Sequence, residues 1–143
     1  MIDKSKAVRP AVIDMADAIN DLETLSVLEY TDFTYPNSDF TYYATSGNDA
    51  PGLVKYGKIA MLSGGIKCVN AQSSLGNKHI MTIPEGYRPR KQMIVVSNGS
   101  SSNKFRLTVD PTGNVYAGTY GTNSQINIPA NAWLALNCVY ITT

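Results

Sequence analysis

The side chains that could carry out nucleophilic or acid–base chemistry are few and scattered. His79 is the only histidine among the 143 residues, and a catalytic triad would have to combine it with Ser73 or Ser74 and a remote aspartate. No G-x-S-x-G nucleophile motif is present. His79 stands at the start of a predicted strand, where a surface or hydrogen-bonded role is the simpler interpretation. We therefore predict that the chain is not an enzyme.

The carboxyl and thiol groups do not form a pattern typical of a hydrolase or a metal site. A glycosidase needs two carboxyl groups facing one cleft, whereas Glu85 and Asp110 both lie in turn sequences. Cys68 and Cys138 stand far apart, and the sequence has no CxxC or Cys/His cluster and no calcium-loop pattern. We predict no metal and no cofactor. Because no apolar secretion signal follows Met1, we interpret both thiols as reduced core residues, with a disulfide as the alternative.

Composition and charge favour a protein that binds a neutral ligand over one that binds nucleic acid or spans a membrane. Twelve basic and eleven acidic residues give a net charge of +1, which argues against nucleic-acid binding. No apolar run approaches the ~20 residues that span a bilayer. Asn, Ser, Thr and Tyr side chains in loops offer hydrogen bonds and flat faces to neutral, polyhydroxylated ligands such as saccharides. Asn98, Tyr120 and Asn123 are the candidate ligand-binding residues, and ordinary polar hairpin loops are the alternative.

The elements that would position these residues begin with a short predicted helix over residues 10–28. Pro10 suits the first turn of a helix. Apolar residues recur at spacings of 4, 3, 4 and 3, which is a heptad seam; they are Val8, Val12, Met15, Ile19 and Leu22. A helix this short is marginal alone in water and must pack on something. We predict that the seam joins identical chains in a bundle; packing on the chain's own β domain is the alternative.

Residues 29–52 form an aromatic-rich connector without a helical period. The sequence Asp-Phe-Thr-Tyr occurs twice, at 32–35 and 39–42, on either side of a Pro-Asn-Ser turn signal. Alternation of aromatic residues suits short strands. We predict a β hairpin or arm packed on the head or on a neighbouring chain, with an exposed aromatic platform for sugars as the alternative. A loop over 46–52 ends this region.

From residue 53 onward, turn signals every eight to twelve residues predict an all-β domain. The expected strands lie near 53–62, 66–70, 78–83, 92–97, 104–110, 114–119, 124–128 and 133–142. Asp110-Pro111-Thr112-Gly113 is a tight turn in which the glycine takes the left-handed position.

The last predicted strand is largely apolar on both faces. Leu134, Leu136, Cys138 and Tyr140 point one way, and Trp133, Ala135, Val139 and Ile141 point the other, with Asn137 among them. An antiparallel strand normally leaves one face to water. We therefore expect a second subunit to cover this one, and we place Trp133 among the oligomerisation residues, with a packed connector as the alternative.

Two segments of the head carry a resemblance to a known family. The apolar stretch Tyr56–Gly64 is followed by Ile83-Pro84-Glu85-Gly86-Tyr87-Arg88-Pro89, and the downstream strands fit the same pattern. Residues 53–143 resemble the β-rich tip domain at the C-terminal end of tailed-bacteriophage fibre, baseplate and receptor-binding proteins. The resemblance implies a fibre tip and a trimer, although the heptad residues by themselves favour a dimer.

These predictions combine into a mainly β protein. A helical oligomerisation segment (1–28) and the connector (29–52) precede an antiparallel, jelly-roll-like β-sandwich head (53–143). The expected function is that of a phage virion structural protein, a fibre or baseplate tip that adheres to a host cell-surface saccharide after assembly in the host cytoplasm. The expected partners are further copies of the chain, other virion proteins and the saccharide, with no nucleic acid or membrane. A capsid decoration or head-fibre protein is one alternative, and a small cell-wall hydrolase is the other.

Overall fold

The computed structural model of the protein describes residues 27–143, except for 31–32, 34, 36–37, 75 and 121–125. Within these ranges the chain is mainly β, as predicted, and all strand pairs are antiparallel. A single short 3-10 turn in this part of the chain spans Ser100–Ser102. The strands are β1 (Val27–Tyr30), β2 (Phe40–Tyr42), β3 (Gly52–Tyr56), β4 (Ile59–Ser63), β5 (Gly65–Cys68), β6 (Gln72–Ser74), β7 (Lys78–Thr82), β8 (Met93–Asn98), β9 (Lys104–Val109), β10 (Asn114–Tyr120), β11 (Ile126–Ile128), β12 (Trp133–Ala135) and β13 (Cys138–Ile141).

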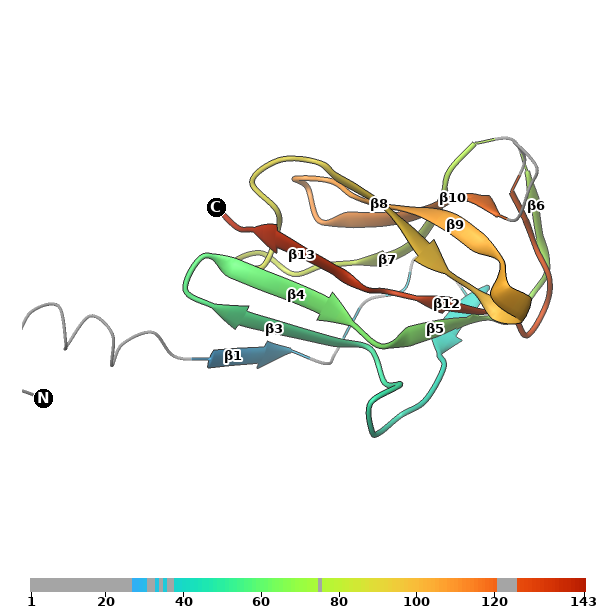
Figure 1. The fold of residues 1–143 in the computed structure, drawn as a ribbon, viewed down its shortest axis with the longest axis horizontal. Coiled ribbons are helices and arrows are strands. Elements are labelled where there is room, and N and C mark those ends of the chain that lie inside the picture. Colours follow the sequence, from blue (N-terminus) through green and yellow to red (C-terminus); the bar gives the residue numbers. More distant parts are fainter. Residues whose placement is uncertain (1–26, 31–32, 34, 36–37, 75, 121–125) are drawn as a thin grey trace, which may run out of the picture.

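Two four-stranded sheets form the body of the head. Their strand orders are β1-β3-β4-β13 and β7-β10-β9-β8, and smaller sheets of β12-β5-β2 and β11-β6 lie at one end (Figure 1). The buried apolar side chains form one core cluster to which both large sheets contribute. Phe105, Leu53 and Leu62 are among its largest fully buried members. The alternation of apolar and polar residues along the strands produces this core, because successive side chains of a strand point to opposite faces.

The first predicted strand of the head, over 53–62, is wrong as a single element. The chain reverses between β3 and β4, and Leu53 of β3 pairs with Leu62 of β4. Gly57 makes the reversal possible, because it adopts φ +57°, a left-handed conformation that glycine reaches without a steric penalty. The Tyr-Gly-Lys sequence is therefore a hairpin turn within an otherwise apolar run.

The last predicted strand, over 133–142, is also divided. β12 pairs with β5, whereas β13 pairs with β4, and Leu136 between them donates its backbone N–H to the Gly64 carbonyl (2.9 Å). The predicted alternation is nevertheless confirmed on its inner side, since Leu134, Leu136, Cys138 and Tyr140 are all buried.

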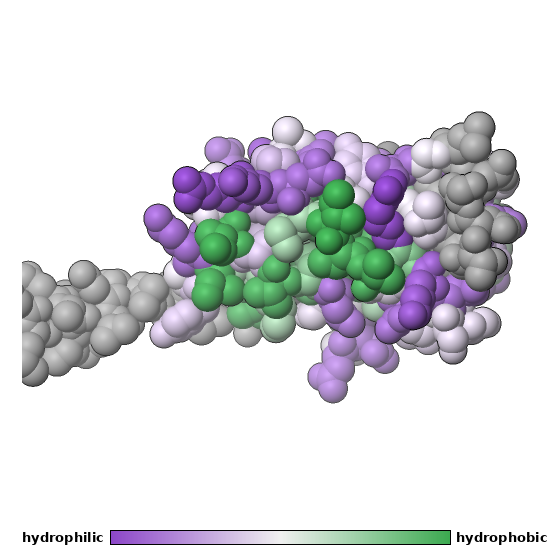
Figure 2. Space-filling view, turned by 45° about the horizontal axis from the view of Figure 1, so that its top comes forward, coloured by the Kyte–Doolittle hydropathy of each residue, from purple (hydrophilic) through white to green (hydrophobic). Residues whose placement is uncertain are grey.

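On the outer side, β13 leaves apolar residues in contact with solvent. Val139 is 56% exposed and Ile141 is 60% exposed. Figure 2 shows apolar residues gathered on one face of the head, with hydrophilic residues around them. The cover by a second subunit that we expected from the sequence stays a prediction.

The region before the head takes part in its sheets. β1 pairs with β3 and β2 pairs with β5, while Phe33 and Phe40 are buried in the core. The predicted packing of the connector on the head is therefore confirmed for these aromatic residues. The helix expected over 10–28 is wrong at its end, because Val27–Tyr30 is a strand that pairs with β3. Its seam residues Val12, Met15, Ile19 and Leu22 lie outside the described residues, so the bundle stays a prediction.

The turn between β9 and β10 follows the sequence prediction closely. Gly113 has φ +92° and donates its N–H to the Asp110 carbonyl (3.0 Å). One carboxylate oxygen of Asp110 accepts hydrogen bonds from the Thr112 N–H (2.9 Å), the Thr112 hydroxyl (2.6 Å) and the Asn114 N–H (3.0 Å). Burial favours the neutral carboxyl, but the hydrogen bonds from Thr112 and Asn114 outweigh it and hold the pKa of Asp110 below its ordinary value.

Replacement of Gly113 by alanine should lower the stability of the head by more than ~1 kcal/mol, because the φ angle is strained for alanine and the added Cβ would collide with the Ile83 carbonyl oxygen. Gly86→Ala is the matched control, since Gly86 has φ +87° with no atom within 4 Å of the added Cβ. Urea unfolding of both variants measures the difference. Equal losses in the two variants would show that the Ile83 contact costs nothing.

Replacement of Asp110 by alanine should cost about 1 kcal/mol of stability at neutral pH, because backbone and side-chain donors of the turn lose their shared acceptor. The lowered pKa means that the wild-type carboxylate stabilises the fold above the unfolded-state pKa of about 4. This contribution to stability disappears as the pH falls through the lowered pKa of Asp110 in the folded state. Denaturant midpoints of both proteins should therefore converge in acid. A constant difference down to pH 2 would contradict this role of the charge.

Candidate functional site

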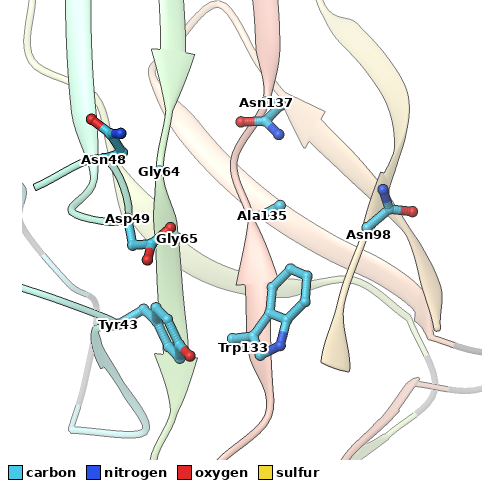
Figure 3. A pocket seen from close by; sticks show the side chains of 9 residues that line it. All are labelled: Tyr43, Asn48, Asp49, Gly64, Gly65, Asn98, Trp133, Ala135 and Asn137. Atoms are coloured by element: carbon cyan, nitrogen blue, oxygen red, sulfur yellow. The ribbon is translucent and has the colours of Figure 1, made fainter. Parts of the chain in front are cut away.

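A pocket of about 440 Å³ opens where β5 and β12 meet the loop after β2 (Figure 3). Two glycines of the β4–β5 junction and Ala135 of β12 lie at its base, and aromatic and polar side chains surround them. Its lining residues are Tyr43, Asn48, Asp49, Gly64, Gly65, Asn98, Trp133, Ala135 and Asn137. Segments from four distant parts of the sequence therefore meet at this site.

Backbone contacts fix the loop that forms one wall of the pocket. The Tyr43 N–H donates to the Gly65 carbonyl (3.1 Å), and the Gly65 N–H donates to the Asp49 carbonyl (3.0 Å). Gly64 has φ +80°, and a Cβ at this position would collide with the carbonyl of Ala50. Only glycine permits this close approach of loop and strand. Tyr43 and Asp49 are thus held beside β5 by its own backbone.

Two aromatic rings form one end of the pocket. The ring centroids of Tyr43 and Trp133 lie 6.4 Å apart with an interplanar angle of 52°. Tyr43 is 48% exposed and Trp133 is half-buried. The Trp133 backbone donates its N–H to the Ser100 hydroxyl (2.8 Å), which links β12 to the 3-10 turn after β8. The two rings offer a ligand two apolar faces that are tilted relative to each other.

Amide and carboxylate groups stand along the other sides of the pocket. Asn48 and Asp49 come from the loop, whereas Asn98 and Asn137 approach from the opposite side (Figure 3). All four side chains are exposed. The rim strand β8 is held next to β12 because the Ser97 hydroxyl donates to the Ala135 carbonyl (2.8 Å). This arrangement provides donors and acceptors on both sides of a ligand that would lie on the rings.

The acidic groups of the pocket bear on the hydrolase alternative. Asp49 is the one carboxyl group among its described lining residues, whereas the usual glycosidase mechanism needs two. No group of three or more His, Cys, Asp or Glu residues that could hold a metal ion exists in the described part of the chain. None of the described helices is long and apolar enough to cross a membrane.

The remaining reactive side chains have structural environments away from the pocket. His79 is hydrogen-bonded to the Met81 carbonyl (2.9 Å) and the Thr82 hydroxyl (3.2 Å) and packs against Tyr116. Cys68 and Cys138 are free and buried, which confirms their interpretation as core residues. Burial raises the pKa of each thiol to about 11, so both are protonated and poorly nucleophilic at neutral pH.

The sequence predictions located this site only in part. Asn98 was predicted to bind ligand and does line the pocket. Trp133 was predicted to contact a second copy and also lines the pocket; that contact stays a prediction. Tyr120 lies in β10 with its side chain outside the described residues, and Asn123 is not described.

Sequence reasoning missed four of the residues that line the pocket, namely Tyr43, Asn48, Asp49 and Asn137. The useful signals were the density of aromatic residues before Tyr43 and the Ser-Gly-Asn-Asp-Ala-Pro-Gly loop at 46–52. Neither signal shows that this loop lies beside Trp133, because that neighbourhood depends on β5 pairing with both β2 and β12.

Comparison with known proteins reveals similarity at the level of the fold. No protein-family model matches the sequence, and no match was found among curated proteins. Among solved structures, the chain is similar to the crystal structure of the receptor binding protein (gp15) of Listeria phage PSA. The TM-score is 0.60 at 15% sequence identity, over 96% of this chain and 81% of that chain. This protein therefore shares its overall fold with that structure.

Proposed function

We propose that this protein is a bacteriophage structural protein of the virion that attaches the particle to its host, and that the pocket beside Trp133 binds a saccharide of the host surface. The observation that carries the proposal is the Tyr43–Trp133 ring pair with Asn48, Asp49 and Asn98 around it. The similarity in fold to a phage receptor binding protein supports the attachment role. The sugar chemistry rests on the pocket itself.

The geometry suits the two kinds of surface that a sugar ring presents. The C–H groups on one face of a pyranose pack on an aromatic ring, while its hydroxyls need donors and acceptors in the ring plane. Tyr43 and Trp133 supply the aromatic rings for the C–H face. The amides of Asn48, Asn98 and Asn137 supply the donors and acceptors for the hydroxyls. Asp49 adds an acceptor for a pair of hydroxyls and would attract a sugar that carries an amine.

A single site of this kind binds weakly, since millimolar affinity corresponds to only about 4 kcal/mol. Attachment of a particle does not need more from each site, because display of many copies on one virion raises the avidity by orders of magnitude. An exposed, preformed pocket on a rigid β scaffold also limits the entropy lost on binding. A shallow sugar site is therefore compatible with firm adhesion.

A capsid decoration or head-fibre protein without a receptor is the function against which the proposal is tested. Trp133 is the only tryptophan in the chain, so its fluorescence reports directly on the pocket. Titration with a panel of bacterial cell-wall oligosaccharides should give a saturable change in this fluorescence for at least one member. The absence of binding across the panel, with intact folding, would favour the decoration role.

Replacement of Tyr43 by alanine should weaken the binding of that oligosaccharide about tenfold, because the sugar loses one of its two stacking surfaces. Tyr56→Ala is the matched control, since Tyr56 is a similarly exposed tyrosine that does not line the pocket. Calorimetric or NMR titrations give the affinities without using the tryptophan signal. Equal affinities of the two variants would exclude the ring pair as the site.

A further inference from the structure

One face of the head carries apolar side chains that no described residue covers. Met61 of β4 lies opposite Val139 of β13, and Ile59 lies opposite Ile141. Their exposed fractions range from 44% for Met61 to 60% for Ile141. We call these four residues the open face. Contiguous exposed apolar patches on soluble proteins commonly mark contact sites when they are large.

Basic residues lie at one end of the open face. Lys58 is adjacent in sequence to Ile59, and its carbonyl accepts the Thr142 N–H (2.8 Å). Arg90 donates its N–H to the Ile141 carbonyl (2.8 Å), and a hollow beside Ile141 is lined by Arg90 and Lys91. Residues 53–143 contain nine basic residues but only two acidic ones, Glu85 and Asp110. Two copies of this face brought together would place like charges against each other, which is unfavourable.

The N-terminal segment of the same chain has the complementary character. Residues 8–22 contain three acidic residues, Asp14, Asp17 and Asp21, and one basic residue, Arg9, which gives a net charge of −2. The apolar seam of residues 8–22 runs along the same segment. Its polar side is therefore acidic, and its narrow apolar side needs a partner.

The segment joins the head beside the open face. Val27, the first residue of β1, lies opposite Tyr56 of β3; Tyr56 lies opposite Ile59, and Ile59 lies opposite Ile141. These four residues form one row across the sheet. The N-terminal segment therefore enters the sheet at this row, which is also where the open face and its basic residues begin.

We propose that residues 8–22 fold back as a helix and pack their apolar seam on the open face of their own chain. A helix of these 15 residues would be about 22 Å long, at roughly 1.5 Å per residue. A five-residue strand such as β4 spans about 17 Å. Residues 23–26 provide a connection of ordinary length between a helix and a strand. The acidic side chains then lie near Lys58, Arg90 and Lys91.

This packing excludes the bundle between copies, because a helix with one narrow apolar stripe cannot use it twice. The two arrangements predict different masses in solution. Neither arrangement requires saccharide binding, although the pocket around Trp133 borders the open face at Asn137. Failure of sugar binding would leave this inference unaffected.

Oxidation of Met61 in the full-length protein tests the inference. Dilute peroxide converts exposed methionines to sulfoxides, and mass spectrometry locates them. We expect Met61 to react at least about threefold faster in Ile19→Asp than in the wild type, because a charge in the seam prevents packing. Asn20→Asp is the matched control, since it adds the same charge one residue away from the seam, and it should behave as the wild type. Fully buried Met81 should resist in all three proteins. Early time points are required, because oxidation of Met15 in the seam would itself weaken the packing.

Two outcomes would overturn the inference. Equal rates for Met61 in the three proteins would show that the seam does not cover the open face. A light-scattering mass of two or more copies that falls to one copy in Ile19→Asp would show that the seam joins chains. Lys91→Glu provides a second variant on the head itself, where reversal of the charge should accelerate Met61 oxidation in a protein that keeps its seam. An unchanged rate in Lys91→Glu would remove the electrostatic part of the inference.

Discussion

The head depends on one segment, the divided C-terminal strand, because its two halves join different sheets. Its first half pairs with β5 and its second half with β4. Isolated bridges from Gly99 to Leu134 and from Pro89 to Thr142 attach the same segment to the loops that flank β8. Alternation keeps its inner side chains in the core throughout. The break at Leu136 and Asn137 lets a single stretch of chain serve two sheets, which a straight strand could not do.

The pocket and the open face follow from the two halves of this segment. β12 places Trp133 at the β5 end, where the aromatic loop after β2 is fixed by the Gly65 backbone. β13 places Val139 and Ile141 on the outer side of the sheet, next to the row where the N-terminal segment enters. The polar pocket therefore lies at the β12 end of the segment, and the exposed apolar residues lie at its β13 end. The pocket and the open face border each other at Asn137, which lines the pocket and also a hollow beside Met61 and Val139.

Much of the β-structure is predictable from local patterns, and the rest depends on contacts between distant residues. Alternation identified the inner face of the last strand, and the Asp-Pro-Thr-Gly sequence identified the turn at Gly113, because both signals are contained in a few neighbouring residues. The sequence prediction did not include the hairpin at Gly57, because apolar residues precede and follow this glycine and the run resembles one continuous strand. Asn98 was selected as a polar loop residue, whereas Tyr43 and Asp49 reach the pocket only through the pairing of β2 with β5. The acidic excess of residues 10–52 and the basic excess of residues 53–143 nearly cancel in the total of +1, so the overall composition conceals them.

The polar side chains around the pocket are all exposed and project from a loop or from strand ends, while the residues that hold the scaffold are buried beneath them. Substitutions at exposed positions usually change folding free energy by no more than about 0.5 kcal/mol. Asn48, Asp49, Asn98 and Asn137 can therefore vary almost freely as far as stability is concerned. Under the proposed role, this arrangement lets a phage adapt to changes in the host surface by substituting a few exposed polar residues, while the β scaffold that carries them stays the same.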